Sequence, residues 1–243
     1  MMVALALIRH GEYSQLADTP SALQPYPLTE KGAEDVREQA RRFGAWLATS
    51  GYQLNAEIHC STLLRAWQTA EIFREELTPL FAEPPRSRSF SALCERSVGA
   101  LANLSIQEIE RIVTLDPRLE PLPKGWKSAS DFRLPFDGAE SLLEAGARVA
   151  AHLQALLEPQ PRPETTKQRN QLKQLNHLNQ LQLVVGHGAS IRHASYHLNV
   201  IPFSDIKRLS MFHGHPVVFE RHNQGWHRLY GNWKQRQPAD PLD

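Results

Sequence analysis

The stretch Val3–Gly11, "VALALIRHG", decides how the rest of the chain is interpreted. Val3–Ile8 is a short, continuous apolar run, which is typical of a central strand buried on both faces of a parallel sheet. Arg9, His10 and Gly11 follow it directly. A single polar strand end is common in proteins, so the meaning of this one depends on the other elements of the chain.

Segments with strand and helix patterns alternate along the chain. Thr29 can cap a helix that Gly51 ends, and the spacing in "SIQE" (105–108) is that of a capping box at the start of another helix. The remaining expected elements are strands at 56–61, 181–186, 216–221 and 226–231, and helices at 61–77 (capped by Ser61 or Thr62), 140–157, 190–198 and 204–209. This order predicts a three-layer α/β/α sandwich with a mostly parallel central sheet, helices on both faces and an antiparallel edge at the end.

The length and composition favour one domain. The chain has 243 residues, of which 41% are hydrophobic, which is enough for one sizeable core. We therefore expect a single domain over 1–243. The irregular, proline-rich segment at about 100–138 is expected to leave the main sheet as a cap or lid. The Gln/Asn-rich segment at about 159–181 is expected to be a tolerated polar insertion.

Several classes of function are disfavoured by composition. The 27 basic and 26 acidic side chains give a net charge of +1, which argues against a nucleic-acid-binding surface. The two cysteines are too few for a disulfide-built secreted scaffold, and no apolar stretch has the length of a membrane span. The N-terminus reads as a first strand and not as a signal peptide. We therefore expect a cytoplasmic protein with a small-molecule partner, and no oligomeric state is predicted.

A second apolar run ends in the same way as the first. "LVVGHG" places His187 and Gly188 directly after the strand expected at 181–186. In open α/β sheets, ligands bind beyond the carboxyl ends of the strands, so His10 and His187 are expected on one rim of the sheet. The glycines after them allow the backbone to approach a ligand closely. Two such strand ends indicate a site more strongly than one.

Arg65 and Glu95 complete the candidate set. Arg65 falls near the first turn of the second helix, where its guanidinium can reach the same rim. Glu95 stands in "LCERSVGAL", where it is either a salt-bridge partner of Arg96 or a member of the site. Arginines bind phosphoryl oxygens, a histidine can act as a nucleophile, and a carboxylic acid can protonate a leaving oxygen. The set predicts phosphoryl transfer without a metal or another cofactor.

Two histidine pairs could instead suggest a metal. His193 and His197 are four residues apart on an expected helix, and His213 and His215 flank a glycine. Neither pair has an obvious cysteine or carboxylate partner, and metal sites are usually completed by such ligands. We therefore predict no metal site.

Four motifs together resemble the histidine phosphatase superfamily, the phosphoglycerate mutase-like phosphatases. They are "LIRHGE", "CSTLLRAWQTAEIF", "ERSVGAL" and "VVGHGASIR". The resemblance implies that His10 is the phosphorylated nucleophile and that Glu95 is the general acid and later the base. It further implies a substrate-binding set of Arg9, Gly11, Arg65, Arg96, His187 and Gly188. Neighbouring cations are then expected to lower the pKa of His10, and a carbonyl is expected to accept from its second ring nitrogen.

The departures from the family pattern favour one activity. Where mutases of the family carry an asparagine after the first motif, this chain has Leu16, and Ser97-Val98 replaces the bulky pair after Glu-Arg. The expected function is therefore hydrolysis of a phosphomonoester through a phosphohistidine on His10. Two alternatives stay open: phosphoglycerate mutase-type transfer, and a non-catalytic module that binds a phosphorylated ligand.

Overall fold

The computed structural model describes residues 3–158, 179–223 and 225–237. Within them, a seven-stranded sheet has the order β4-β3-β5-β1-β7-β8, with β2 pairing beside β5. Its strands are β1 (Val3–Arg9), β2 (Tyr52–Leu54), β3 (Glu57–Ser61), β4 (Arg86–Phe90), β5 (Asn179–Gly186), β7 (Pro216–His222) and β8 (Gly225–Tyr230). The pairs β1–β5, β2–β5, β3–β4 and β3–β5 are parallel, whereas β7 is antiparallel to both β1 and β8. The sheet is therefore mostly parallel, with an antiparallel edge, as the sequence predicts.

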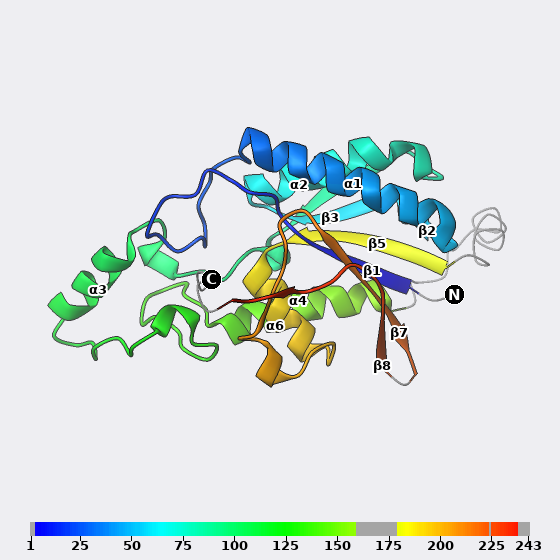
Figure 1. Ribbon diagram of the computed structural model, residues 1–243. Helices are drawn as coiled ribbons and strands as arrows, with labels where there is room; N and C mark the ends of the chain where they lie inside the picture. Colours follow the sequence, from blue (N-terminus) through cyan, green and yellow to red (C-terminus); the bar gives the residue numbers. More distant parts are fainter. Residues whose placement is uncertain (1–2, 159–178, 224, 238–243) are drawn as a thin grey trace, which may run out of the picture.

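Helices cover both faces of this sheet. α1 (Glu30–Ser50) and α2 (Leu64–Leu77) lie on one side, and α4 (Leu142–Leu157) and α6 (Gly188–His197) lie on the other (Figure 1). α1 begins after Thr29, whose side chain accepts a hydrogen bond from the N–H of Gly32, and ends at Gly51 in the left-handed conformation. The predicted three-layer α/β/α architecture is confirmed.

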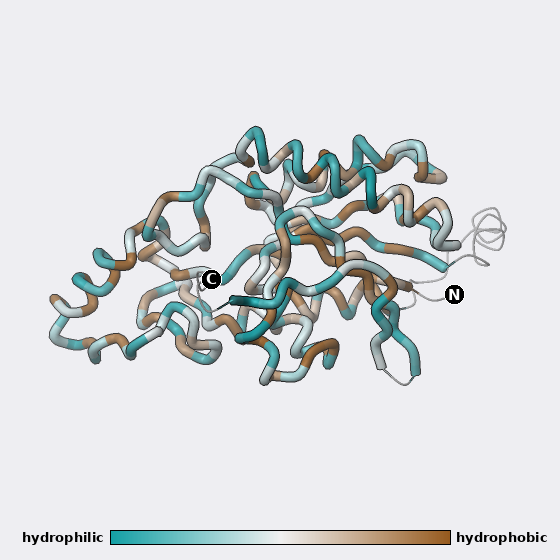
Figure 2. The backbone as a smooth tube through the Cα atoms, viewed as in Figure 1, coloured by the Kyte–Doolittle hydropathy of each residue, from teal (hydrophilic) through white to brown (hydrophobic). Residues whose placement is uncertain are grey.

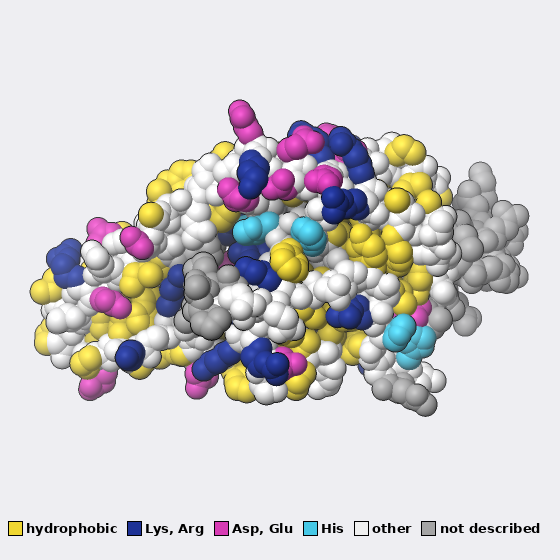
Figure 3. Space-filling model, in the orientation of Figure 1, with side chains coloured by type: hydrophobic (Ala, Val, Ile, Leu, Met, Phe, Trp, Pro, Cys, Tyr) yellow, Lys and Arg dark blue, Asp and Glu magenta, His cyan; other side chains and the backbone are white. Residues whose placement is uncertain are grey.

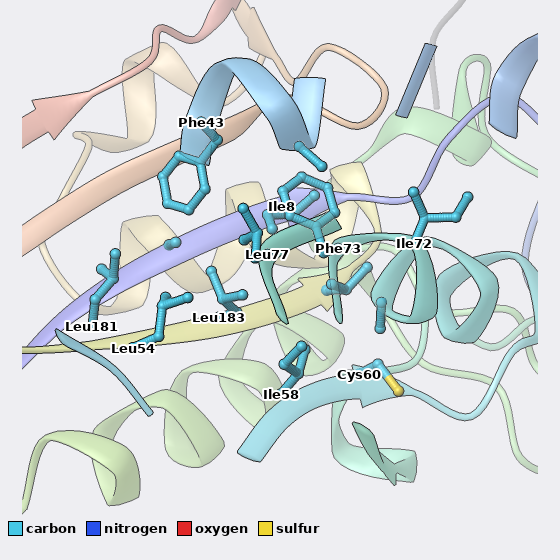
Figure 4. Packing of buried hydrophobic residues seen from close by; sticks show 14 of the residues in the cluster. Ile8, Phe43, Leu54, Ile58, Cys60, Ile72, Phe73, Leu77, Leu181 and Leu183 are labelled. Carbon is cyan, nitrogen blue, oxygen red and sulfur yellow. The ribbon is translucent and has the colours of Figure 1, made fainter. Parts of the chain in front are cut away.

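β1 packs against both helical layers. Ala4, Ala6 and Ile8 belong to the core beneath α1 and α2, whereas Leu5 and Leu7 belong to the core against α4 and α6. Successive side chains of a strand point to opposite faces, so a strand between two layers must be apolar at every position. Figure 4 shows the first of these cores, where Phe43 of α1 and Phe73 of α2 lie over the sheet, and Figure 2 shows the apolar colour concentrated along the central strands.

The start of α2 differs from the prediction. Neither Ser61 nor Thr62 caps this helix, because the residue before its first turn is Leu63, which makes no side-chain capping bond. The hydroxyl of Ser61 instead accepts a hydrogen bond from the N–H of Leu63 at 3.2 Å and lies 2.8 Å from Nε2 of His187. The side chain of Ser61 thus contacts His187, which is distant in sequence, and does not cap α2.

Further elements also differ from the sequence prediction. α4 begins at Leu142 and not at Glu140, because Ser141 and Glu144 form a capping box there. The helix expected at 204–209 is only a short turn at Phe203–Asp205, followed by β6 (Leu209–Ser210), which pairs with β9 (Lys234–Gln235). That pairing and β2 were not predicted, because both depend on partners distant in sequence.

The segment between β4 and α4 leaves the sheet and forms a small core of its own. It contains α3 (Ile106–Leu115), which lies far from the sheet in Figure 1 and starts with the predicted capping box of Ser105 and Glu108. Ile109, Trp126 and other buried side chains of this segment pack with Ala22 from the loop after β1. Most of the polar segment predicted at about 159–181 lies outside the described residues, and 179–181 belong to β5. No described helix combines the length and the hydropathy that a membrane span requires.

Candidate active site

The ends of β1 and β5 bring the two predicted histidines together. The strands pair in parallel with Arg9 opposite Gly186, so the residues that follow lie side by side at one edge of the sheet. The N–H of His10 donates to the carbonyl of Gly186 at 3.0 Å, and the imidazole centroids of His10 and His187 are 5.0 Å apart. Both side chains are almost fully buried, with 3% and 0% exposed.

Two hydrogen bonds fix the tautomer of His10. Its Nδ1 lies 2.7 Å from the carbonyl oxygen of Gly11, and its Nε2 lies 3.2 Å from Nε of Arg65. A carbonyl can only accept and a guanidinium can only donate, so Nδ1 carries the proton and Nε2 presents a lone pair. The pKa of His10 is well below its usual value, first because the ring is buried and then because His187, Arg65 and Arg9 oppose a further positive charge. This agrees with the expectation from sequence and adds burial as its largest cause.

Arg65 is held by the loop that follows β1. It lies in the first turn of α2 and is fully buried. Its Nη1 donates to the carbonyl of Gln24 at 2.7 Å, and its Nη2 donates to those of Ser21 and Ala22 at 2.9 and 3.2 Å. Burial lowers the pKa of Arg65, but a guanidinium stays charged at any pH that the protein tolerates. The loop thus orients a permanent cation beside His10.

His187 connects Arg65 to the end of β3. Its Nδ1 lies 3.3 Å from Nη2 of Arg65, which donates, so Nε2 carries the proton and donates to Oγ of Ser61 at 2.8 Å. Burial and the charges of Arg65 and Arg9 keep the pKa of His187 well below its usual value. The ring is therefore neutral at neutral pH.

Arg9 offers an unused donor at the same rim. Its Nη1 donates to the carbonyl of Met211 at 3.2 Å, whereas its Nε is buried and makes no hydrogen bond to the described residues. A Cβ atom on Gly188 would lie 3.1 Å from both Cδ and Nε of Arg9. Gly188 therefore makes space for the side chain of Arg9, a reason for glycine that the sequence does not reveal.

Gly11 also has a packing role. A Cβ atom there would lie 2.7 Å from Cγ2 of Val36 and 3.1 Å from the carbonyl oxygen of Gly32, both in α1. The N–H of Gly11 donates to Oγ1 of Thr69 in α2 at 3.0 Å. The glycine after His10 thus lets α1 pack closely against the end of β1.

Glu95 is anchored by two backbone donors. Its Oε1 accepts from the N–H of Arg96 at 2.9 Å and from the N–H of Ser190 at 3.2 Å. Ser190 lies in the first turn of α6, whose free N–H groups and dipole favour a carboxylate. Glu95 and Arg96 are both buried, with 7% and 5% exposed, and both line one pocket with Ala189. This places the predicted acid on the rim that carries His187.

Two aromatic rings beside His10 were not among the predicted site residues. The ring of Tyr13 lies edge-on to His10 at 5.3 Å, and the guanidinium of Arg65 lies 4.4 Å from its centroid. His213 lies 5.7 Å from His10, because it pairs with Arg9 and the N–H of Gly214 donates to the carbonyl of Arg9 at 2.8 Å. A third His-Gly pair in the sequence, His213-Gly214, was the available signal for it.

The site lies in the middle of the molecule. Figure 3 shows histidine, Lys and Arg side chains gathered there around a hollow. Among the described residues, no group of three or more His, Cys, Asp or Glu side chains is arranged to hold a metal ion.

A profile of the histidine phosphatase superfamily (branch 1) matches residues 5–234, nearly the whole chain. The chain belongs to this superfamily. The resemblance seen in the four sequence motifs is thereby confirmed. His10, Arg65, Glu95 and His187 all lie within the matched residues.

Known proteins of similar sequence or structure carry phosphatase names. The chain is 40% identical over 73 residues to the serine/threonine-protein phosphatase Pgam5, mitochondrial, of Drosophila persimilis; the match covers 30% of this chain and only 22% of that protein. The fold is similar to mycobacterial glucosyl-3-phosphoglycerate phosphatase, with a TM-score of 0.62, 19% identity, and 94% of this chain and 97% of that one covered. It is also similar to the alpha-ribazole phosphatase of Shigella flexneri, with a TM-score of 0.61, 18% identity, and 93% and 94% covered.

Proposed function

We propose that this protein hydrolyses phosphomonoesters through a covalent phosphohistidine on His10, without a metal ion. The observation that carries the proposal is the tautomer of His10. Its proton is held at Nδ1 by the carbonyl of Gly11, so the unprotonated Nε2 accepts a hydrogen bond from Nε of Arg65. A nucleophilic histidine requires this state, and burial maintains it by lowering the pKa of the ring.

The first step transfers the phosphoryl group to the enzyme. Nε2 of His10 attacks phosphorus, the bond from phosphorus to the ester oxygen breaks, and that oxygen takes a proton from the carboxylic acid of Glu95. The imidazole carries a positive charge until the phosphoryl group leaves, and the carbonyl of Gly11 stabilises it through Nδ1–H. The leaving group departs as a neutral alcohol at the ester oxygen.

The second step restores the enzyme. The carboxylate of Glu95 takes a proton from water, the water oxygen bonds to phosphorus, and the phosphorus–nitrogen bond breaks. His10 regains its lone pair, Glu95 regains its proton and inorganic phosphate is released. The same carboxyl group thus acts as acid and then as base, as the two half-reactions require.

Arg9 and Arg65 are proposed to hold the phosphoryl oxygens in both steps. Arg65 already points Nε at the atom that attacks, and Arg9 has a buried Nε with no hydrogen bond among the described residues. Prearranged guanidinium donors stabilise the charge on a phosphoryl group in flight, because a buried site gives such donors more effect than water would. His187 orients Arg65, and Gly188 makes space for Arg9.

The remaining parts of the proposal concern the surroundings of this site. The substrate is a small phosphorylated molecule, the segment at about 100–138 acts as a cap on the site, and the protein works in the cytoplasm. Lys127 of that segment lines the pocket beside Glu95, which supports the role of a cap. Hydrolysis is favoured over mutase-type transfer because Leu16 and Ser97-Val98 replace the mutase pattern.

A rapid-quench experiment tests the nucleophile. Wild-type protein is mixed with ³²P-labelled phosphomonoester in the presence of EDTA, quenched in alkali, and examined for acid-labile phosphate on protein. We expect a labelled enzyme in the wild type and in the control His227→Gln, whose imidazole is exposed on β8, and none in His10→Gln. Labelling that persists in His10→Gln would show that another residue is the nucleophile.

Two further assays separate the alternatives. Conversion of one phosphoglycerate isomer to another that depends on a bisphosphate primer would favour mutase-type transfer. Tight binding of phosphate together with no turnover of any phosphomonoester between pH 5 and 9 would favour a non-catalytic binding module.

A further inference from the structure

Three backbone carbonyls of the loop after β1 hold the guanidinium of Arg65. Nη1 donates to the carbonyl of Gln24 at 2.7 Å, and Nη2 donates to those of Ser21 and Ala22 at 2.9 and 3.2 Å. Among the described residues, the only other groups to which this guanidinium donates are the two imidazoles of the site. The orientation of the fork towards the proposed nucleophile therefore depends on where the loop places its carbonyls.

Ala22 belongs at the same time to a different core. While its carbonyl accepts from Arg65, only 3% of the residue is exposed, and it packs in one buried cluster with Ile109, Trp126 and Leu134. Those three side chains come from the segment between β4 and α4. Because interiors are close-packed, a change in the packing of this small core displaces Ala22 and the carbonyl that it carries.

Two further contacts fix the same loop. The N–H of Ile106, the first residue of α3, donates to the carbonyl of Asp18 at 2.8 Å, which satisfies a group that has no partner within its own helix. The side chain of Gln24 is fully buried, accepts from the N–H of Leu16 at 2.9 Å and donates to the carbonyl of Pro20 at 3.1 Å. The loop is thus bound to α3 and also closed by its own hydrogen bonds.

We propose that Ala22 is a positioning residue of the phosphatase reaction, through which the small core of the segment between β4 and α4 orients Arg65. The inference rests on the proposed function, in which Arg65 holds the phosphoryl group. A displacement of about 1 Å in a group that acts on the reacting atoms can lower the rate about 100-fold, even when its cause lies far from the chemistry. The packing of this segment then contributes to the rate, in addition to its proposed role as a cap.

This role has a kinetic signature that a simple cover of the site would not have. A segment that only encloses the substrate contributes to binding, so loosening it should raise KM. A segment that orients Arg65 acts mainly in the transition state, where the donors of the guanidinium meet the charge in flight. Loosening its core should therefore lower kcat more than it raises KM.

The variant Ile109→Ala tests this signature. Ile109 is fully buried on α3, which lies far from the sheet (Figure 1), and its truncation loosens the small core. We expect kcat for p-nitrophenyl phosphate to fall by about tenfold while KM stays within about twofold of the wild type. Ile109→Val, which removes one methyl group, should keep at least about half of kcat. Ala22→Gly, which removes the packed methyl group itself, should lower kcat as Ile109→Ala does.

The matched control is a truncation in the core beneath α1. Leu47 is 4% exposed there, and it contacts neither the loop after β1 nor the small core in the clusters that contain them. Leu47→Ala should change kcat by less than about twofold, because no residue of the site depends on it. A tenfold loss in this control as well would mean that kcat responds to any loss of stability, and the inference would fail.

A double-mutant cycle shows whether the small core acts through Arg65. In the background of Arg65→Lys the planar fork is absent, so Ile109→Ala should lower kcat there by less than about twofold. The same cycle with Ala22→Gly should give the same result. Equal factors in the two backgrounds would show that the core acts independently of Arg65 and would overturn the inference.

The outcomes separate this inference from the proposed function. Circular dichroism and thermal unfolding establish that each variant is folded, and Ala22→Gly supplies the cycle if Ile109→Ala does not fold. Wild-type turnover that depends on His10, together with additive cycles or an unchanged kcat in Ile109→Ala and Ala22→Gly, overturns the inference and leaves phosphatase activity intact. No turnover of p-nitrophenyl phosphate by the wild type overturns the proposed function itself, and the inference with it.

Discussion

Nε of Arg65 donates a hydrogen bond to Nε2 of His10 across 3.2 Å, although the two residues are 55 positions apart in the chain. The guanidinium thereby excludes a proton from the nitrogen that is proposed to attack, and the carbonyl of Gly11 takes the proton on the other side. One contact thus sets both the protonation state and the orientation of the proposed nucleophile.

Replacing Arg65 by lysine should show how much this contact matters. Lysine keeps the charge but lacks the planar fork that reaches His10, His187 and the carbonyls of Ser21, Ala22 and Gln24. We expect kcat/KM for p-nitrophenyl phosphate to fall by roughly 100- to 1000-fold, the loss typical of one prearranged donor. Arg74→Lys, in the last turn of the same helix, is the matched control. A decrease of less than about fivefold in Arg65→Lys would mean that charge alone suffices.

The phenol of Tyr13 gives a test that separates stability from catalysis. Its oxygen is buried and has no hydrogen-bonding partner in the part of the chain that the structure describes, while its ring packs against His10 and Arg65. Tyr13→Phe keeps the ring and removes the unpaired oxygen, so the free energy of unfolding should be unchanged or higher by about 1 kcal/mol in urea titrations. Tyr13→Leu should lower it, because the contact between guanidinium and ring is lost. A clear loss of stability in Tyr13→Phe would contradict this expectation.

The two glycines that follow the histidines should respond differently to alanine. In Gly188→Ala the new Cβ displaces the side chain of Arg9, so kcat/KM should fall by about tenfold or more while the protein stays folded. In Gly11→Ala the Cβ meets Val36 of α1, so the main effect should be a loss of about 1–3 kcal/mol of stability. Thermal unfolding and steady-state kinetics of both variants check the contrast. Equal effects on both quantities would contradict the separate roles.

A pair of histidines away from the site should make stability depend on pH. Nδ1 of His59 lies 2.9 Å from Nε2 of His152, and burial, followed by the charge of His59, lowers the pKa of His152 from 6.5 to about 4. The unfolded chain therefore binds a proton at a higher pH than the folded one. The stabilising contribution is present above pH 6.5 and is lost as the pH falls towards 4.

The variant His152→Gln isolates this contribution. It should lose stability less steeply than the wild type between pH 6.5 and 4, by on the order of 1–2 kcal/mol after screening by solvent. His10 and His187, whose pKa values are also lowered, contribute to the slope in both proteins. Urea titrations at several pH values provide the measurement, and parallel curves would show that His152 does not titrate in this way.

Local patterns were sufficient to predict most of the fold. The apolar runs of β1 and β5, the cap at Thr29 and the capping box at Ser105 each depend on neighbours in sequence, and the structure has them where expected. Two local predictions were wrong: a cap of α2 at Ser61 or Thr62, and a helix at 204–209. In both places a distant partner, His187 or β9, decides the local conformation.

The candidate site divides in the same way. Residue types and their order along the chain indicated His10, Arg65, Glu95 and His187, because phosphoryl transfer needs cations, a nucleophile and an acid. The structure brings these residues to one rim of the sheet. The structure also places the ring of Tyr13 beside His10. This contact was not predicted, because the spacing of residues along the chain does not determine which side chains meet at the sheet edge.

The amino-acid sequence by itself therefore determined the layers of this protein, the strand ends that carry its histidines and the family to which it belongs. Only the tertiary structure decided which nitrogen of His10 carries a proton and what each glycine makes room for. The physical reason is one of range. Periodicity and capping act between near neighbours, whereas protonation, close packing and the pairing of a buried charge depend on residues that folding brings together.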